Sequence, residues 1–174
     1  MTETTPYDRD RAGYTREALA RLVLSEQAVE LSDSAAGLVG TRYDTATGLG
    51  GRASQARQLV ELAERALASA VVYERERGSS WEEIAAYLGI DAEEAEQRFG
   101  PAVRAWHTAF EEPYRLDETG RKRIPALPTA AYDPAWACHH LDGWARLRGI
   151  GIGESEAVSA SLTRVPAAPP AVTP

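Results

Sequence analysis

Three neighbouring side chains near the C-terminal end have the types that bind metal ions: Cys138, His139 and His140. Consecutive residues of a helix lie about 100° apart around its axis, so three in a row cannot converge on one ion. His107 is the remaining histidine, and a site that includes it would need a coincidence of folding. We therefore predict no metal and no cofactor. The single cysteine also excludes an internal disulfide.

Catalytic chemistry has no evident set of residues in this chain. Nucleophilic catalysis needs a serine or cysteine beside a base and an orienting acid. The three histidines fall on two predicted helices, and none stands in a glycine-flanked turn. The glycine-rich stretches 48–51 and 149–153 do not join a predicted strand to a helix, so neither has the context of a phosphate-binding loop. We do not expect an enzyme.

The densest group of basic side chains comprises Arg121, Lys122 and Arg123. Two segments, 114–117 and 121–124, could pair around it as a short β-hairpin. In that arrangement the basic cluster would contact the phosphates of a nucleic acid. The alternative is an exposed, solvated loop, which is the commoner setting for a run of three charges.

The elements that would position such contacts centre on residues 78–99. Ser80 and Glu83 have the spacing of a capping box at the start of a short helix. Gly89 stands where that helix must end, because a residue without a Cβ enters the left-handed conformation cheaply. Asp91 can then cap a second helix. Two short capped helices joined by a tight turn have the order of a helix-turn-helix unit.

The stretch SWEEIAAYLGIDAEEAEQRFG, residues 80–100, resembles the helix-turn-helix of bacterial sigma-factor region-four-like regulators, a group common in actinobacteria. The second helix of that group ends in a similar Ala-x-Gln-Arg-Phe string, which is residues 95–99 here. The resemblance implies a DNA-binding transcription regulator whose second helix enters the major groove. Such a regulator would act as a homodimer, since one unit gives few contacts. The residues predicted to contact DNA are Ser80, Gln97, Arg98, Arg104, Arg121, Lys122 and Arg123.

The charge of the second helix favours an alternative function. Asp91, Glu93, Glu94 and Glu96 oppose Arg98 alone, and four acids against one base leave −3. DNA affinity rests mainly on neutralising phosphates with lysine and arginine. The alternative is a protein-interaction adaptor with a degenerate, acidic helix-turn-helix that does not bind DNA directly. Asp91, Glu93 and Glu96 would then contact a basic partner, and Arg98 would form an internal ion pair.

The flanking segments predict helices that support this unit. Thr15 can cap a helix that ends near residue 31 or continues to 39, and residues 52–77 have apolar side chains at three- and four-residue steps. Pro101 suits the first turn of a further helix. Asp133 and Pro134 suit the start of a last helix, on which an aromatic stripe is predicted to dock onto the bundle beside Trp106. That stripe comprises Trp136, His140, Trp144 and Leu147.

The predicted fold is all-α, a small helical bundle with a central helix-turn-helix and room for one short β-hairpin after it. Residues 1–13 are predicted to be a flexible terminus, 14–148 the helical domain, and 149–174, rich in glycine, alanine, serine and proline, a disordered tail. The predicted core is formed by Leu59, Ala63, Leu67, Val71, Ile84, Leu88 and Phe99.

Charge and hydropathy suggest a location. The net charge of −7 gives no global attraction to nucleic acid or to an anionic membrane. The polar N-terminus does not resemble a secretory signal, and no run approaches the ~18 apolar residues of a membrane span. We therefore expect a cytoplasmic protein.

Overall fold

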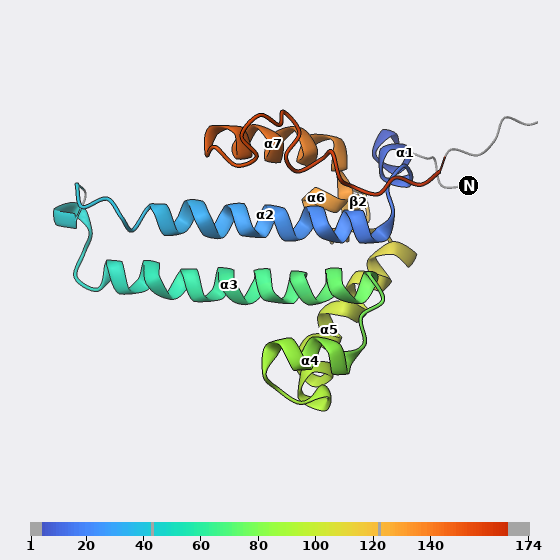
Figure 1. The fold of residues 1–174 in the computed structure, drawn as a ribbon, viewed down its shortest axis with the longest axis horizontal. Coiled ribbons are helices and arrows are strands. Elements are labelled where there is room, and N and C mark those ends of the chain that lie inside the picture. The colour runs from blue at the N-terminus through green and yellow to red at the C-terminus, as the bar shows by residue number, and fades with distance from the viewer. Residues whose placement is uncertain (1–4, 43, 122, 167–174) are drawn as a thin grey trace, which may run out of the picture.

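The computed structural model describes residues 5–42, 44–121 and 123–166, and it confirms the predicted all-α fold with one short hairpin (Figure 1). Two long helices, α2 (Arg16–Ala36) and α3 (Gly51–Glu76), lie side by side as an antiparallel pair. The loop between them carries a 3-10 turn, η1 (Asp44–Ala46). None of the helices in the described part of the chain is long and apolar enough to cross a membrane.

The other helices cover the two sides of this pair. On the α2 side lie α1 (Pro6–Ala12), α6 (Thr129–Tyr132) and α7 (Pro134–Leu147), and on the α3 side lie α4 (Trp81–Leu88) and α5 (Ala92–Glu111) (Figure 1). The strands β1 (Tyr114–Leu116) and β2 (Arg123–Pro125) follow α5. The largest fully buried side chains of the core are Leu19, Leu22, Leu62, Pro134 and Leu141.

The helix starts that the sequence indicated are confirmed. Thr15 Oγ1 accepts a hydrogen bond from the Ala18 N–H at 3.2 Å, and α2 then runs to residue 36, between the two predicted ends. At the last helix, the Asp133 carboxylate accepts from the Trp136 N–H at 3.0 Å, and Pro134 occupies the first turn. Each cap satisfies a backbone donor that has no partner inside its helix.

The tight turn between α4 and α5 is also confirmed. Ser80 Oγ accepts from the Glu83 N–H at 3.2 Å, and the Glu83 carboxylate accepts from the Ser80 N–H at 2.7 Å, which closes the capping box. Gly89 ends α4 with φ of 69°, in the left-handed region. The Asp91 carboxylate then accepts from the Glu94 N–H at 2.7 Å and starts α5.

Helix α5 differs from the prediction, because it continues through Pro101 where a new helix was expected to begin. A proline inside a helix removes one backbone hydrogen bond and normally costs about 3 kcal/mol. The buried face of α5 carries Phe99, Val103 and Trp106 on both sides of the proline. Packing along this continuous face offsets the local cost and keeps the helix in one piece.

The predicted core is correct only near α4 and α5. In the N-terminal half of α3, Ala63 is exposed and Leu59 is only half-buried. The reason is that α2 packs against a neighbouring face of α3, which carries the buried Leu62. The other expected core residues are Val71, Ile84 and Phe99, which are buried, and Leu67 and Leu88, which pack at the edge of the core.

The aromatic stripe of α7 was predicted to dock onto the bundle, and this is wrong for all of its residues except Trp144, which is half-buried. Trp136 is 47% exposed and Leu147 is 88% exposed, while the ring of His140 stacks on Trp136 at 4.9 Å. Trp144 donates its indole N–H to Asp33 of α2 at 3.1 Å. The side chains of another face, most of them small, allow close approach to α2, and the buried residues of α7 are Pro134, Ala137, Cys138, Leu141, Asp142 and Ala145.

Both termini have more structure than the sequence indicated. Residues 6–12 form α1. Residues 149–166 fold back past α7 toward α1 (Figure 1), so the prediction of disorder is wrong there. The Asp142 carboxylate accepts from the Val158 and Ser159 N–H groups at 2.8 and 3.2 Å, and the Val165 N–H donates to the Gly13 carbonyl. Residues 167–174 lie outside the described part.

The hairpin is confirmed, with Arg115 opposite Ile124 in an antiparallel register. Its turn is organised by the Asp117 carboxylate, which accepts from the backbone N–H groups of Thr119 and Arg121 at 3.1 and 3.0 Å. The hairpin begins at Tyr114, after α5 has ended at Glu111.

Candidate interaction site on the α4–α5 lobe

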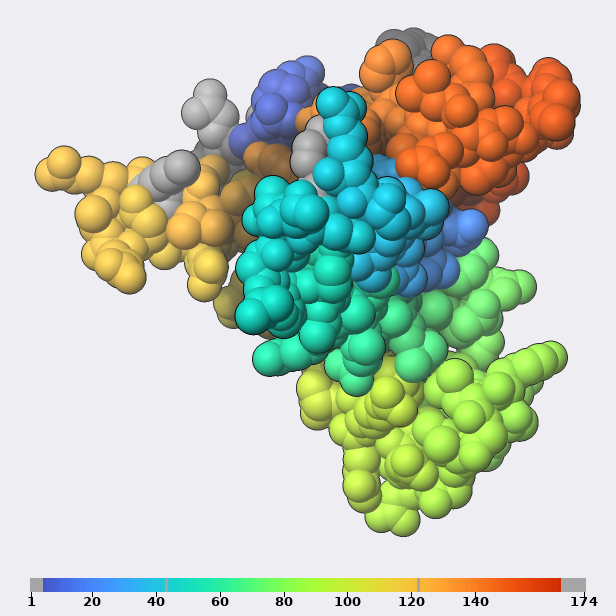
Figure 2. Space-filling view, turned by 90° about the vertical axis from the view of Figure 1, so that its left-hand side faces the viewer, coloured from blue at the N-terminus to red at the C-terminus, as the bar shows by residue number. Residues whose placement is uncertain are grey.

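Helix α4, the tight turn and the first two turns of α5 form a lobe that projects from the bundle, shown in yellow-green in Figure 2. We call residues 80–99 the tip. Ile84 and Phe99 are buried where the tip meets α3, and they attach it to the body. The turn between α4 and α5 and the start of α5 lie at the far end of the lobe (Figure 1).

The exposed surface of the tip is strongly acidic. It carries six exposed carboxylates and one exposed arginine, namely Glu82, Glu83, Asp91, Glu93, Glu94 and Glu96 against Arg98. Hydrogen bonds within the helix cap hold the pKa of Glu82 below its usual value, so this group is ionised at neutral pH. The tip thus presents predominantly negative charge to the solvent.

Some of these acids also stabilise the local structure. Asp91 and Glu83 cap the two helices, as described above. Glu93 accepts a hydrogen bond from the Gln97 side-chain amide at 3.1 Å. Glu96 is exposed one turn further along α5. Of the three residues predicted to bind a partner, Glu93 and Glu96 therefore lie on the surface of α5, whereas the carboxylate of Asp91 is already engaged as the N-cap of that helix.

The residues predicted to contact DNA from the tip are partly engaged within it. The Ser80 hydroxyl oxygen accepts from the backbone, and the Gln97 amide donates to Glu93. The Arg98 guanidinium lies over the ring of Phe99, with its carbon 4.9 Å from the ring centre. Among the described residues, the internal ion pair considered for Arg98 is not formed.

The remaining basic residues of the DNA prediction do not gather at the tip. Arg98 and Arg104 are six residues apart on α5, which puts them about 120° apart around the helix. The hairpin follows the far end of α5, about 30 Å from its start, and Figure 2 shows it in amber on a different side of the molecule. Arg121 and Arg123 are exposed there, and Lys122 lies outside the described residues.

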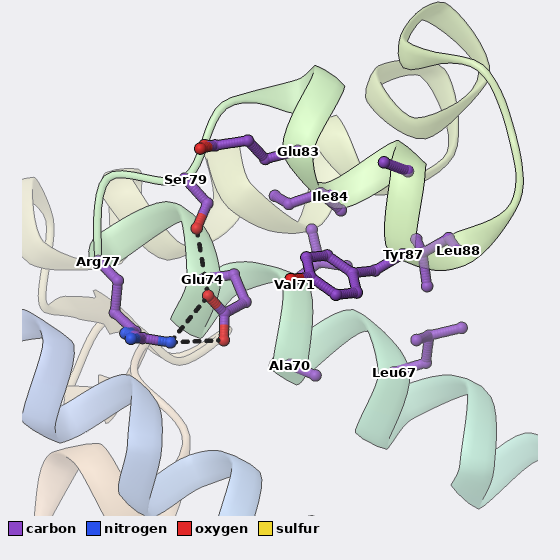
Figure 3. A pocket seen from close by; sticks show the side chains of 11 residues that line it. Leu67, Ala70, Val71, Glu74, Arg77, Ser79, Glu83, Ile84, Tyr87 and Leu88 are labelled. Atoms are coloured by element: carbon purple, nitrogen blue, oxygen red, sulfur yellow. Dashed lines mark hydrogen bonds and ion pairs between the residues drawn. The ribbon is translucent and has the colours of Figure 1, made fainter.

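An apolar groove of about 730 Å³ runs between α3 and α4 (Figure 3). Leu67 and Ala70 contribute from α3, and Tyr87 and Leu88 contribute from α4. The Tyr87 ring stands beside Val71 and is 95% exposed. Sequence patterns did not indicate this groove, since it arises where two helices meet at an angle. An exposed tyrosine on a short helix was the one available signal.

The polar end of the same groove is already satisfied within the chain. Glu74 forms an ion pair with Arg77 at 3.0 Å and accepts from the Ser79 hydroxyl at 3.2 Å (Figure 3). This pair is close to neutral, so it adds little charge to the groove. The groove is therefore mainly an apolar surface beside an acidic one.

The candidate metal ligands near the C-terminal end are not brought together. Cys138 is buried, with its sulfur 3.6 Å from the Tyr14 hydroxyl, whereas His139 and His140 are exposed on α7. Burial raises the pKa of the Cys138 thiol, which makes it a weak nucleophile at neutral pH. In the part of the chain that the structure describes, no group of three histidine, cysteine, aspartate or glutamate residues could hold a metal ion.

Comparison with known proteins adds no family to these observations. No protein-family model, curated protein or solved structure matches the chain.

Proposed function

We propose that this chain is a protein-interaction module that uses the acidic tip to bind a positively charged partner. The observation that carries the proposal is the set of six exposed carboxylates, with one arginine, on a lobe that projects from the bundle. Charge of one sign on a projecting surface attracts a partner of opposite charge and raises the rate of association.

DNA binding by a transcription regulator is the second candidate. In its favour are the two capped helices, the tight turn at Gly89 and the exposed N-terminal end of α5, the end that would read base edges in a major groove. Against it stands the charge, because the tip would bring carboxylates between two rows of phosphates. Arg121 and Arg123 lie on a different part of the molecule and do not offset that charge.

A charge reversal with a matched control separates the two candidates. The test variant is Glu93→Lys with Glu96→Lys, at the start of α5. The control is Glu111→Lys with Glu112→Lys, because these exposed residues lie at the other end of the same helix and change the net charge equally. Both are measured by capture of proteins from extracts of the producing cells, and by anisotropy with labelled genomic DNA fragments at ~50 mM salt, where binding to DNA is strongest.

On the proposed function, the wild-type chain captures basic proteins, the test variant loses them, and the control retains them. The wild-type chain, the test variant and the control variant all bind DNA fragments weakly. The proposal fails if capture is unaffected by the test variant. Tight DNA binding by the wild-type chain, strengthened in the test variant, would instead support the DNA-binding candidate.

A further inference from the structure

The apolar surface beside the tip is longer than the groove itself. Along α3, Val60 and Ala63 precede Leu67 at seven and four residues, so all three share one face of the helix. Val60 is 57% exposed and Ala63 is exposed, so neither is covered in the described part of the chain. Figure 1 shows α4 and α5 beneath only the C-terminal half of α3. The groove thus opens onto an uncovered apolar stripe.

The dimensions of this surface match a helical ligand. The distance along α3 from Val60 to Val71 is about 16 Å, or three helical turns. Tyr87 and Leu88 form a wall on the α4 side of its inner part. A helix that lies in such a groove contacts it with residues at positions i, i+3 or i+4, and i+7. The surface could therefore take three turns of an amphipathic helix.

The charges around the groove select the kind of helix. Glu83 lines the groove, and the exposed Glu64 stands three residues before Leu67 on α3. Neither takes part in an ion pair among the described residues. A second copy of this chain would bring a net charge of −7 and the same acids to the interface, and like charges in contact oppose association. Lysine or arginine beside an apolar stripe would complement these acids.

We propose that the groove between α3 and α4, together with Val60 and Ala63, binds a basic amphipathic helix of a partner protein. The apolar face of that helix packs on Leu67, Tyr87 and Leu88, and its lysine or arginine side chains meet the surrounding carboxylates. This inference rests on the proposed function, because it specifies the chemistry of the basic partner. The apolar contacts supply most of the affinity, and the charges supply specificity and speed of association.

The test uses the full-length chain and a designed probe. The probe is an 18-residue helical peptide with leucine on one face and lysine on the other. Two control peptides are a scrambled sequence of the same composition and a version with glutamate in place of lysine. Backbone amide shifts in NMR map the contact, and fluorescence anisotropy at ~150 mM salt gives the affinity. We expect shifts within 60–71 and 83–88, where the leucine face packs, and within 93–96, where the lysine face meets the tip carboxylates, and binding at least about tenfold weaker for both control peptides.

A pair of variants tests the groove directly. Tyr87→Ser removes its exposed wall, and Leu147→Ser removes an equally exposed apolar side chain from α7. Both positions are exposed, so the variants keep their fold, which circular dichroism checks. We expect Tyr87→Ser to weaken the probe at least about tenfold and Leu147→Ser to leave its affinity unchanged.

The outcomes separate this inference from the proposed function. If the Tyr87→Ser variant binds the probe peptide normally while the double reversal at Glu93 and Glu96 binds it weakly, the groove proposal is overturned and the acidic site stands. If only the Tyr87→Ser variant loses binding of the probe, the groove stands and the proposed role of the tip charge fails. Equal binding of the scrambled peptide overturns the groove. Self-association in sedimentation that disappears in Tyr87→Ser also overturns it, because the occupant is then a second copy.

Discussion

One glutamate ties together the helices that hold the tip in place, and its removal is the sharpest stability test. The Glu76 carboxylate on α3 is 11% exposed. It accepts from the Trp106 indole N–H of α5 at 3.0 Å and from Arg16 of α2 at 3.0 Å, and it lies 3.2 Å from the His107 ring nitrogen Nε2 of α5. Glu76→Ala would remove all three contacts, and the buried indole N–H would lose its acceptor.

The contacts differ in how much they stabilise the fold. An unpaired buried donor costs about 1–3 kcal/mol, and Trp106 is 5% exposed. The side chains of Arg16 and His107 are 42% and 52% exposed, so solvent screens these pairs and each contributes about 1 kcal/mol or less. We expect Glu76→Ala to lower the free energy of unfolding by about 2–4 kcal/mol, which is a fall of very roughly 5–15 °C in Tm for a domain of this size.

The matched control is Glu74→Ala, two residues earlier on the same helix. The side chain of Glu74 is 38% exposed, and among the described residues it bonds only Arg77 and Ser79 in the adjoining turn, so its loss should cost about 1 kcal/mol or less. Urea denaturation followed by circular dichroism and by tryptophan fluorescence measures both variants. If Glu76→Ala is no more destabilising than Glu74→Ala, the link between α2, α3 and α5 is not formed as described.

Three further predictions follow from the same geometry. Gly89→Ala places a Cβ on a residue with φ of 69° and should lower the free energy of unfolding by about 1–2 kcal/mol. Gly143→Ala, in the middle of α7 with open space around it, should raise it by up to about 1 kcal/mol. Thermal melts measure both variants, and equal effects would contradict the left-handed turn at Gly89. Burial, together with the hydrogen bond to Cys138, raises the pKa of Tyr14 from 10.0 to about 12. Because the pKa is higher in the folded state than in the unfolded state, this contribution to stability is complete below pH 10 and is lost as pH rises toward 12. An absorbance titration at 295 nm measures tyrosine ionisation, and Tyr14→Phe should remove one tyrosine that titrates late. If no late-titrating tyrosine is lost in this variant, the prediction is refuted. Asp142→Ala removes the acceptor that holds residues 158–159, so limited proteolysis should cut 150–166 at least about tenfold faster while α2–α5 stay resistant; unchanged cleavage would show that this carboxylate does not anchor the segment.

Local signals in the sequence determined the parts of the fold that could be predicted. The caps at Thr15, Ser80, Asp91 and Asp133 involve residues three positions apart, and the left-handed turn at Gly89 depends on one residue. Such features depend little on the rest of the chain, and so they could be read directly.

The parts that differed depend on contacts between distant residues. Helix α5 passes through Pro101 because its buried face continues on both sides, which a local rule for proline cannot include. The face of α7 was assigned by its aromatic side chains, but close packing on α2 favours the small ones opposite. The C-terminal segment is held by Asp142 and by a bond from Val165 to Gly13, and its composition gave no sign of either.

The candidate site divides in the same way. The acidic character of the tip was visible in the sequence, because Glu93 and Glu96 lie close together near the start of α5. The separation of the hairpin arginines from the tip was not visible in the sequence, because it depends on α5 being one uninterrupted helix. The groove beside Tyr87 also arises only when α4 folds against α3.

The most direct test of the central claim is the affinity of the leucine–lysine probe peptide for the two double charge reversals, compared at one salt concentration. We predict that Glu93→Lys with Glu96→Lys weakens binding at least about tenfold, while Glu111→Lys with Glu112→Lys changes it less than about twofold. Equal losses in both variants would contradict the account, because net charge rather than the acidic tip would then govern binding.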